Sequence, residues 1–374
     1  MALPGLAVPK VAGNASILCQ DVIVNMGMVP TIPDEGLAQV RAPVMHDVAK
    51  LAGVSHQTVS RVLNAHPNVS ATTRGRVEQA IAQLGYYRNT AARALVTRSS
   101  RTLGVITVDT AEYGPTRTLF AIESAARSAG YYVNFVSVNQ IDRQHMVEAI
   151  DHLRAASVDG LIAIVPLRAA IASLRGISTD VPLVEVETNE ALNNEPVVMD
   201  QVSGARSATQ HLLDLGHRTV LHVAGPQEWL AAEARVHGWR AALTAANREI
   251  RPYVAGDWSA RAGYRAGREI APQVTAGDVT AVFVANDQMA LGVLRAIYDA
   301  DLSVPGDVSV VGFDDIPEAE HFIPALTTMR QDFGEVGRRY VVDVLRRISG
   351  RPQRSRQPIQ PELIVRASSG RPPR

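Results

Sequence analysis

The apolar residues around position 50 recur at the three- and four-residue spacing of helices, with a break in the middle. Gly53 stands at the break, and glycine readily adopts the left-handed conformation that ends a helix. Ser55 follows, and serine is a favourable N-cap for a second helix. The pattern therefore predicts two short helices joined by a tight turn. Their apolar faces consist of Val48, Ala49 and Ala52 in the first helix and Val59, Val62 and Leu63 in the second.

The second predicted helix also has a polar face. It carries Gln57, Ser60, Arg61 and Asn64 at helical spacing, with His56 in the first turn. A glutamine can form two hydrogen bonds to adenine and an arginine two to guanine, whereas hydroxyl and amide side chains suit phosphates. The two helices are therefore predicted to form a helix-turn-helix that reads DNA. The alternative is a buried helical hairpin with a polar outer face.

Residues 52–64 read AGVSHQTVSRVLN, which resembles the DNA-binding headpiece of the lactose-repressor family of bacterial transcription factors. In that family the second helix enters the major groove of DNA. The resemblance implies that His56, Gln57 and Arg61 contact base edges. It also implies that phosphates are held by Ser55, Ser60, Asn64 and Thr73.

A third helix is predicted to begin after Ser70, and another helix of about two turns after Asn89. So short a helix is marginal by itself, so it is expected to be ordered only when it is docked. The resemblance implies that it is a hinge helix, with Asn89 and Ala92 at the DNA and Leu95 wedged between base pairs of the minor groove. A flexible linker with a chance leucine is the alternative.

From residue 102 onward, short apolar runs alternate with helical stretches, and the alternation restarts near residue 200. Such repetition is typical of βαβ units, so an α/β domain with two parallel-sheet lobes and a cleft between them is predicted. Ligands of such sheets bind beyond the carboxyl ends of the strands. The predicted strands are 103–108, 131–138, 160–165, 182–187, 197–200, 219–225, 281–285 and 308–315.

Polar and aromatic residues follow several of these strands, and the set favours a neutral ligand rich in hydroxyl groups. The family resemblance extends over this body, most strongly in 256–260, 284–292, 309–315 and 324–333, and implies a two-lobed domain like the periplasmic binding proteins, with two doubly wound sheets and a sugar effector. Departures at Val108, Ile164, Glu112 and Tyr113 leave the identity of the sugar open. The candidate effector-binding residues are Glu187, Arg235, Trp258, Asn286, Asp314, Gln331 and Phe333.

Each of these candidates also has a structural alternative. Asn286 and Asp314 are placed where they would cap the segments that follow, and Trp258 and Phe333 would serve as ordinary core aromatics. The neighbouring carboxylates Asp287 and Asp315 are expected to be mainly structural.

The net charge is zero, but it is unevenly distributed. Between Arg41 and Arg101 there are nine lysines or arginines against two carboxylates, a net charge of +7, so the remainder carries −7. A basic head on an acidic body predicts attraction to phosphates at one end only, with an affinity that falls steeply as salt is added.

Composition also argues against an enzyme and against a metal site. Cys19 is the only cysteine, and the ten histidines form no metal-binding motif; His46, His56 and His66 are expected to face solvent or DNA. We find no GxGxxG after a strand, no GxSxG and no P-loop, so no catalytic residues and no cofactor are predicted.

The domain boundaries follow from these patterns. Residues 1–43 are expected to be a disordered extension or to precede the true start at Met26 or Met28, and they hold no convincing secretion signal. No membrane-spanning run is present, which predicts a cytoplasmic protein. The headpiece is placed at 44–88, the hinge helix and linker at 89–101, lobe 1 at about 102–199 plus 333–360, lobe 2 at about 200–331 and a disordered tail at 367–374; the whole two-lobed domain spans 102–366.

The sequence thus predicts a transcriptional repressor that binds double-stranded operator DNA and is released by a small sugar, of the galactoside type. A homodimer is expected, because no leucine-heptad helix like the one that makes tetramers in the family follows residue 366. Three alternatives remain at this point: a periplasmic-type sugar-binding protein, an enzyme, and a regulator whose ligand strengthens DNA binding.

Overall fold

The computed structural model describes residues 43–64, 66–87, 99–108, 111–186, 199–352 and 357–373. The chain divides into two compact units at Arg88 and Asn89, a headpiece and a body, and each is described by itself. The hinge-helix predictions (Asn89, Ala92 and Leu95) and the prediction for Glu187 lie outside the described residues.

The headpiece is a bundle of helices, as the apolar pattern predicted. Val48, Val59 and Val77, one from each helix, have no exposed surface and form the centre of its core. The helices are α1 (Met45–Ala52), α2 (His56–Leu63) and α3 (Ala71–Leu84).

The turn and the caps of the headpiece follow the local sequence. Gly53 adopts a left-handed conformation, with φ 63°, and ends α1. The hydroxyl of Ser55 accepts a hydrogen bond from the backbone N–H of Thr58 at 3.2 Å, so the serine caps α2. Ser70 caps α3 in the same way through the N–H of Thr73, also at 3.2 Å.

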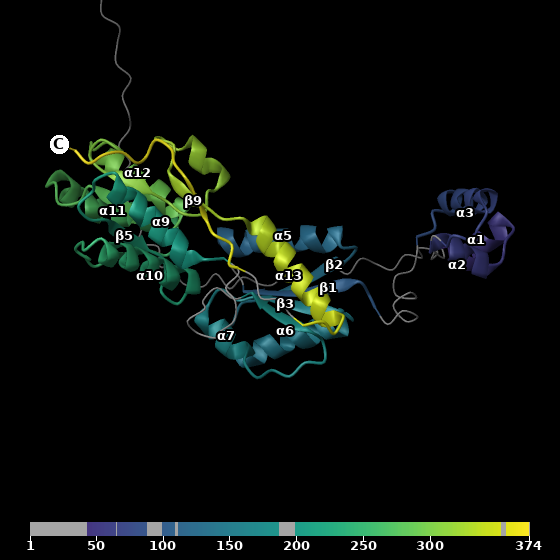
Figure 1. Cartoon of the computed structure of the whole chain (residues 1–374). Coiled ribbons are helices and arrows are strands. Elements are labelled where there is room, and N and C mark those ends of the chain that lie inside the picture. The colour runs from purple at the N-terminus through teal and green to yellow at the C-terminus, as the bar shows by residue number, and fades with distance from the viewer. Residues whose placement is uncertain are drawn as a thin grey trace, which may run out of the picture. The chain divides into compact units, whose positions relative to one another are not determined.

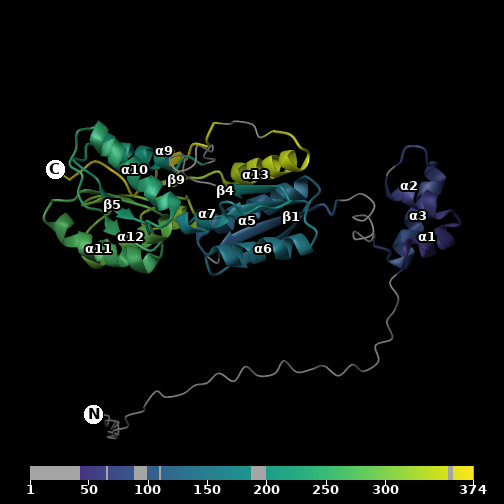
Figure 2. The ribbon, with the colours of Figure 1, turned by 90° about the horizontal axis from the view of Figure 1, so that it is seen from below.

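Lobe 1 of the body is a four-stranded parallel sheet with helices on both faces. The strand order is β2-β1-β3-β4. Helices α5 and α13 pack together on one face, and α6 and α7 cover the other (Figures 1 and 2). The elements are β1 (Thr102–Val108), α5 (Tyr113–Ser128), β2 (Tyr132–Val138), α6 (Arg143–Ala155), β3 (Gly160–Ile164), α7 (Arg168–Leu174), β4 (Leu183–Val186) and α13 (Phe333–Ile348).

Lobe 2 repeats the same architecture with the strand order β6-β5-β7-β8. Helices α9 and α10 pack on one face and α11 and α12 on the other (Figure 1). The predicted α/β class with two doubly wound parallel sheets is therefore confirmed. The elements are α9 (Gln201–Asp214), β5 (Leu221–Ala224), α10 (Leu230–Ala245), β6 (Val254–Ala255), α11 (Ala260–Thr275), β7 (Ala281–Val284), α12 (Asp287–Asp299), β8 (Ser309–Val311) and the 3-10 helix η1 (Pro317–His321).

The chain passes between the lobes after the short strand β9 (Thr328–Arg330), enters α13 of lobe 1, and returns to pair with β9 through β10 (Glu362–Ile364). Neither of these short strands was predicted. No helix among the described residues is long and apolar enough to cross a membrane.

The last residues are packed against lobe 2, so the prediction of a disordered tail at 367–374 was wrong for the described residues 367–373. Ser368 is fully buried; its hydroxyl donates to the carbonyl of Val310 at 2.6 Å and accepts from the N–H of Thr327 at 2.8 Å. The carbonyl of Gly370 lies 3.0 Å from a ring nitrogen of His217. The tail is ordered because it satisfies the free edge of β8, an interaction that composition does not reveal.

Helices α11 and α12 approach each other closely at two glycines. A Cβ added to Gly292 would lie 2.0 Å from the carbonyl oxygen of Ala260, and one added to Gly263 would lie 2.0 Å from that of Met289. Backbone atoms occupy the space of a side chain at both positions. The packing of these helices therefore depends on glycine.

We expect Gly292→Ala to lower the free energy of unfolding of the body by about 1–3 kcal/mol, because the methyl group forces the two backbones apart. Urea denaturation followed by tryptophan fluorescence measures this. Gly114→Ala is the matched control, because a Cβ at this helical glycine meets no atom within 4 Å. Equal midpoints for the two variants would contradict the close approach.

Candidate functional site

A cavity of about 100 Å³ lies between the two lobes at the carboxyl ends of their strands. Lobe 1 contributes mainly apolar side chains, and lobe 2 contributes most of the polar ones. Six of the seven predicted effector residues line it: Arg235, Trp258, Asn286, Asp314, Gln331 and Phe333. The structure thus brings together residues that are up to about a hundred positions apart in the sequence.

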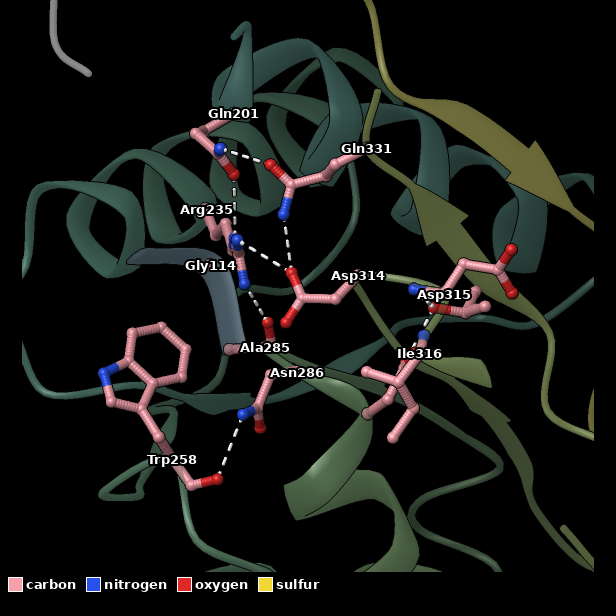
Figure 3. A network of polar contacts seen from close by, with 12 residues as sticks. Gly114, Gln201, Arg235, Trp258, Ala285, Asn286, Asp314, Asp315, Ile316 and Gln331 are labelled. Carbon is pink, nitrogen blue, oxygen red and sulfur yellow. Dashed lines mark hydrogen bonds and ion pairs between the residues drawn. The ribbon is translucent and has the colours of Figure 1, made fainter. Parts of the chain in front are cut away.

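A buried ion pair occupies the lobe-2 side of the cavity (Figure 3). Arg235 of α10 and Asp314, just after β8, are 4% and 6% exposed, and Nη2 of the arginine donates to Oδ1 of the aspartate at 3.3 Å. Nη1 of Arg235 donates to the carbonyl of Ala285, at the end of β7. The arginine therefore ties a helix to the ends of two strands.

Two glutamines close this pair into a ring. Nε of Arg235 donates to Oε1 of Gln201 at 3.0 Å, and Nε2 of Gln201 donates to Oε1 of Gln331 at 2.8 Å. Nε2 of Gln331 then donates to Oδ1 of Asp314 at 2.6 Å, as Figure 3 shows. Each member orients the next, so the polar groups are held in place before any ligand enters.

Burial shifts the titration of both charged members. It raises the pKa of Asp314 to about 6, although Arg235 and Gln331 act in the opposite direction. Burial lowers the pKa of Arg235, against the attraction of Asp314 and Asp287. Because an isolated buried charge is costly, each member depends on the other.

Aromatic rings form another side of the cavity. Trp229 meets Trp258 edge-on, with centroids 5.8 Å apart, and Phe333 meets Tyr113 in the same manner at 5.8 Å. The guanidinium of Arg235 lies 5.6 Å from the ring centroid of Trp258. These rings leave flat apolar surfaces beside the polar network.

The position of Trp258 depends on its backbone and on a neighbouring glycine. Its φ is 72°, a conformation that is strained for a bulky side chain. A Cβ on Gly225, after β5, would lie 2.3 Å from the indole ring. Asp314 also has a positive φ, 111°, and such strain concentrates at functional sites.

Asn286 fulfils the structural alternative as well as lining the cavity. It caps α12 by accepting from the N–H of Met289 at 3.0 Å, and Nδ2 donates to the carbonyl of Trp258 and to Gln288. Both amide hydrogens are thus used, and only the remaining lone pair of Oδ1 is left for a ligand.

Asp287 and Asp315 were expected to be mainly structural, and their contacts agree with this expectation. Asp287 is fully buried and accepts from the hydroxyl of Thr328 at 2.6 Å and from the N–H of Ile316 at 2.9 Å. Asp315 forms ion pairs with Arg330 at 2.6 Å and with Arg366 at 2.7 Å.

The sequence analysis missed two residues of the site. Gln201 begins α9 and directly follows the predicted strand 197–200, so the strand-end rule pointed to its position, but it was not chosen. Trp229 lies in the loop that follows β5, so the rule that identified the other strand-end residues would have found it.

The headpiece carries the residues that were predicted to contact DNA. His56, Gln57 and Arg61 of α2 are exposed on the side away from the headpiece core, as is Asn64 at its end. Ser60 and Thr73 are partly buried, and the hydroxyl of Ser55 already serves as the cap of α2. His46 and His66 are exposed, and no group of metal-binding side chains occurs among the described residues.

The comparisons with known proteins assign both units. Residues 44–89 match the model of the bacterial regulatory proteins of the lacI family, and residues 209–369 match a periplasmic binding protein-like domain. The lactose operon repressor of Escherichia coli (strain K12) is 36% identical over 330 residues, which cover 87% of this chain and 90% of that one. The chain belongs to the lacI family of bacterial regulatory proteins.

Other members of the lacI family agree with this assignment. The regulator CelR of Thermobifida fusca is 34% identical over 340 residues, which cover 88% of this chain and 98% of that one. A crystal structure of the lac repressor dimer bound to operator and the anti-inducer ONPF matches with a TM-score of 0.78 at 36% identity, over 88% of this chain and all of that one. The structure of CelR with cellobiose matches with a TM-score of 0.64 at 31% identity, over 87% of this chain and 99% of that one.

Family membership makes the chain a DNA-binding transcriptional repressor and not an enzyme. It also removes the alternative of a sugar-binding protein without a regulatory role, because the headpiece itself matches the family.

We expect Asp314→Ala to lower the free energy of unfolding by about 3–5 kcal/mol at a pH of about 8, because Arg235 is left buried without its carboxylate. Asp299→Ala provides the control. It removes an exposed ion pair with Arg295 on α12 and should change stability far less. Urea denaturation of both variants measures the difference. Similar losses of unfolding free energy would show that the buried pair stabilises the fold no more than the exposed pair.

Proposed function

We propose that the protein is a cytoplasmic, homodimeric repressor that a small neutral sugar, of the galactoside type, releases from its operator. The observation that carries this proposal is the cavity between the lobes, where a preformed ring of polar groups lies beside flat aromatic surfaces. Such a combination suits a pyranose, whose hydroxyl groups need hydrogen bonds and whose C–H face needs an apolar cover.

The proposed sugar contacts are the polar groups that can still form further hydrogen bonds. Oδ1 of Asp314 is occupied by Arg235 and Gln331, and no hydrogen bond to Oδ2 occurs within the described residues. Arg235 has five N–H groups, of which three are used there. A sugar hydroxyl would donate to Asp314 and accept from Arg235, with Trp258 and Phe333 against the ring; Glu187 is retained as a further candidate.

In the headpiece, α2 is proposed to enter the major groove, where Gln57 and Arg61 would read base edges together with His56. Ser55, Ser60, Asn64 and Thr73 are proposed to hold phosphates. The hinge residues Asn89, Ala92 and Leu95 are proposed to contact the minor groove. Two such headpieces in a dimer would match the two halves of a near-palindromic operator.

Exposed apolar side chains on both lobes support a homodimer. Phe120 on α5, with Tyr132 and Phe135 on the edge strand β2, are 57–70% exposed. On lobe 2, Tyr298 of α12 is 70% exposed and Ile323 is 95% exposed. Apolar surface of this kind favours contact with a second subunit. Sedimentation that shows a monomer or a stable tetramer at micromolar concentration would contradict the proposed homodimer.

The sugar would act by linkage. If it favours a closed arrangement of the lobes, and the operator favours a different arrangement, each ligand must weaken the binding of the other.

Fluorescence anisotropy tests the proposal directly. The purified protein is titrated onto a symmetric DNA sequence from upstream of its own gene, and galactosides, glucosides and monosaccharides are then added. We expect specific binding and release by one sugar. Tighter binding would make that sugar a corepressor, and the absence of any effect across the panel would contradict a sugar effector.

Arg61→Ala should weaken operator binding by about 1–3 kcal/mol and relax the preference at one base pair, because its two bonds to guanine are lost. Arg76→Ala, an exposed arginine of α3 outside the proposed contacts, is the charge-matched control. Anisotropy with operator and with unrelated DNA separates the two effects. An equal loss on both DNAs for Arg61→Ala would assign it to phosphate contact alone.

Sugar affinity should fall as the pH is lowered through about 6. In this range Asp314, whose pKa is raised to about 6, becomes protonated. The protonated carboxyl group can no longer accept hydrogen bonds on both of its oxygens. For a ligand that requires the carboxylate, the loss approaches about tenfold per pH unit below that pKa. Calorimetric titration at several pH values measures it, and an affinity independent of pH would exclude Asp314 as an ionised acceptor.

A further inference from the structure

The carboxylate of Asp159 binds residues 99–101, the segment through which the chain enters lobe 1 and which we call the entry segment. Asp159 lies in the loop between α6 and β3, and it accepts hydrogen bonds from the backbone N–H groups of Ser100 at 2.8 Å and Arg101 at 3.0 Å. The hydroxyl groups of Ser99 and Ser100 donate to the same carboxylate, that of Ser100 at 3.1 Å. Four donors from three consecutive residues thus converge on one side chain.

The backbone of Arg101 is fixed on both of its sides. Its φ is 54°, a left-handed conformation that residues other than glycine rarely adopt. Its N–H donates to Asp159, and its carbonyl accepts from the N–H of Tyr132 at 2.8 Å. Its guanidinium lies 5.7 Å from the ring centroid of Tyr131. A sparsely populated conformation persists only where the surroundings impose it, so these contacts set the direction of the entry segment.

The loop that carries Asp159 is in turn attached to the core of lobe 1. Its N–H donates to the carbonyl of Thr102 at the start of β1, at 2.8 Å, and the next residue, Gly160, begins the neighbouring strand β3 (Figure 1). A Cβ on Gly160 would lie 2.7 Å from the side chain of Val344 and 2.9 Å from that of Ile348, both on α13. Because the core is packed this closely, the carboxylate is an anchor that follows lobe 1.

The direction of the entry segment matters because it joins the body to the headpiece. The two compact units divide at Arg88 and Asn89, and residues 99–101 are the first described residues of the body. In the proposed homodimer, two headpieces bind two half-sites of one operator. Once the first headpiece is bound, the second binds in an intramolecular step, whose strength depends on how well its attachment matches the second half-site.

We propose that Asp159 is a positioning residue for operator binding, which fixes the entry segment so that the two headpieces of a dimer match one spacing of half-sites. This inference rests on the proposed homodimer. The expected effect is opposite to that of charge alone. Removal of a carboxylate reduces the repulsion of phosphates and would strengthen binding to any DNA, whereas loss of the anchor weakens binding to the operator.

The test compares two spacings of the half-sites by fluorescence anisotropy. The operator is selected from random DNA with the wild-type protein, and a second DNA has two base pairs added between the half-sites, which turns one half-site by about 70° relative to the other. The wild-type protein is expected to bind the selected spacing at least about tenfold more tightly. Asp159→Ala should bind the selected operator about five- to tenfold more weakly and the lengthened one almost as the wild type does, so that the discrimination falls to about twofold or less.

Asp151→Ala is the matched control. It removes a carboxylate from α6, where Asp151 is exposed and pairs with Arg154 at 2.9 Å, and no hydrogen bond joins it to the described entry segment. Arg154 keeps a partner in Asp180 at 2.8 Å. This variant should discriminate between the spacings as the wild type does.

Thermal unfolding establishes that the variants are folded. If Asp159→Ala is not, Asp159→Asn replaces it. The amide keeps one acceptor oxygen and loses the other, so the discrimination should fall by part of the same amount.

The outcomes separate this inference from the proposed function. If the wild type distinguishes the two spacings and the folded Asp159 variant does so equally, Asp159 positions nothing and the homodimer stands. If the variant binds both DNAs more tightly, the carboxylate acts by its charge alone and the inference is wrong. If the wild type binds both spacings equally, the proposed binding of two half-sites by a dimer is itself contradicted, and the inference fails with it.

Discussion

The buried pair of Arg235 and Asp314 is the interaction on which the cavity between the lobes depends. It joins α10 to the ends of β7 and β8, and the two glutamines Gln201 and Gln331 extend it to α9 and to the crossing after β9. Burying two charges is expensive, and apolar side chains of similar size often stabilise a fold better. We therefore propose that the pair is retained for its place in the cavity, where it would hold donors and acceptors ready for a ligand.

The two lobes contribute different parts of the cavity wall. Lobe 2 holds the hydrogen-bonded polar network, whereas lobe 1 supplies an apolar wall, the Tyr113–Phe333 pair and the carboxylate of Glu112. A ligand that contacts both sides stabilises one relative arrangement of the lobes. Because the chain crosses between the lobes next to Gln331 and Phe333, the cavity and the crossing share residues. Under the proposed function, this sharing would couple binding in the cavity to the geometry of the body.

Sequence patterns predicted most of the fold because its elements have strong local signals. Ser55, Ser70 and Gly53 fixed the headpiece helices, and continuous apolar runs marked the buried strands. The strands β6, β9 and β10 have only two or three residues each, too few for a pattern, and were missed. The packing of Ser368 on β8 was missed for a related reason, since it depends on an unpaired sheet edge.

Most of the residues predicted to line the cavity follow strands, and the two that were missed, Gln201 and Trp229, show that the strand-end rule was applied incompletely. Arg235 lies on a helix and was assigned only through the family resemblance, whereas Gln201, which follows the predicted strand 197–200, was passed over. The structural role of Asn286 as a cap was foreseen as an alternative and coexists with its place in the cavity. Such double roles cannot be separated by pattern, because both require a polar residue at the same strand end.

The central claim is that the sugar and the operator weaken each other's binding. The reciprocity of the two binding sites tests this claim most directly. Once a sugar that acts on operator binding is known, its affinity is measured by calorimetry for the free protein and for the protein saturated with operator. The account predicts that the operator weakens sugar binding by the same factor by which the sugar weakens operator binding. Equal affinities in the two states would contradict it, because the cavity and the headpiece would then be energetically independent.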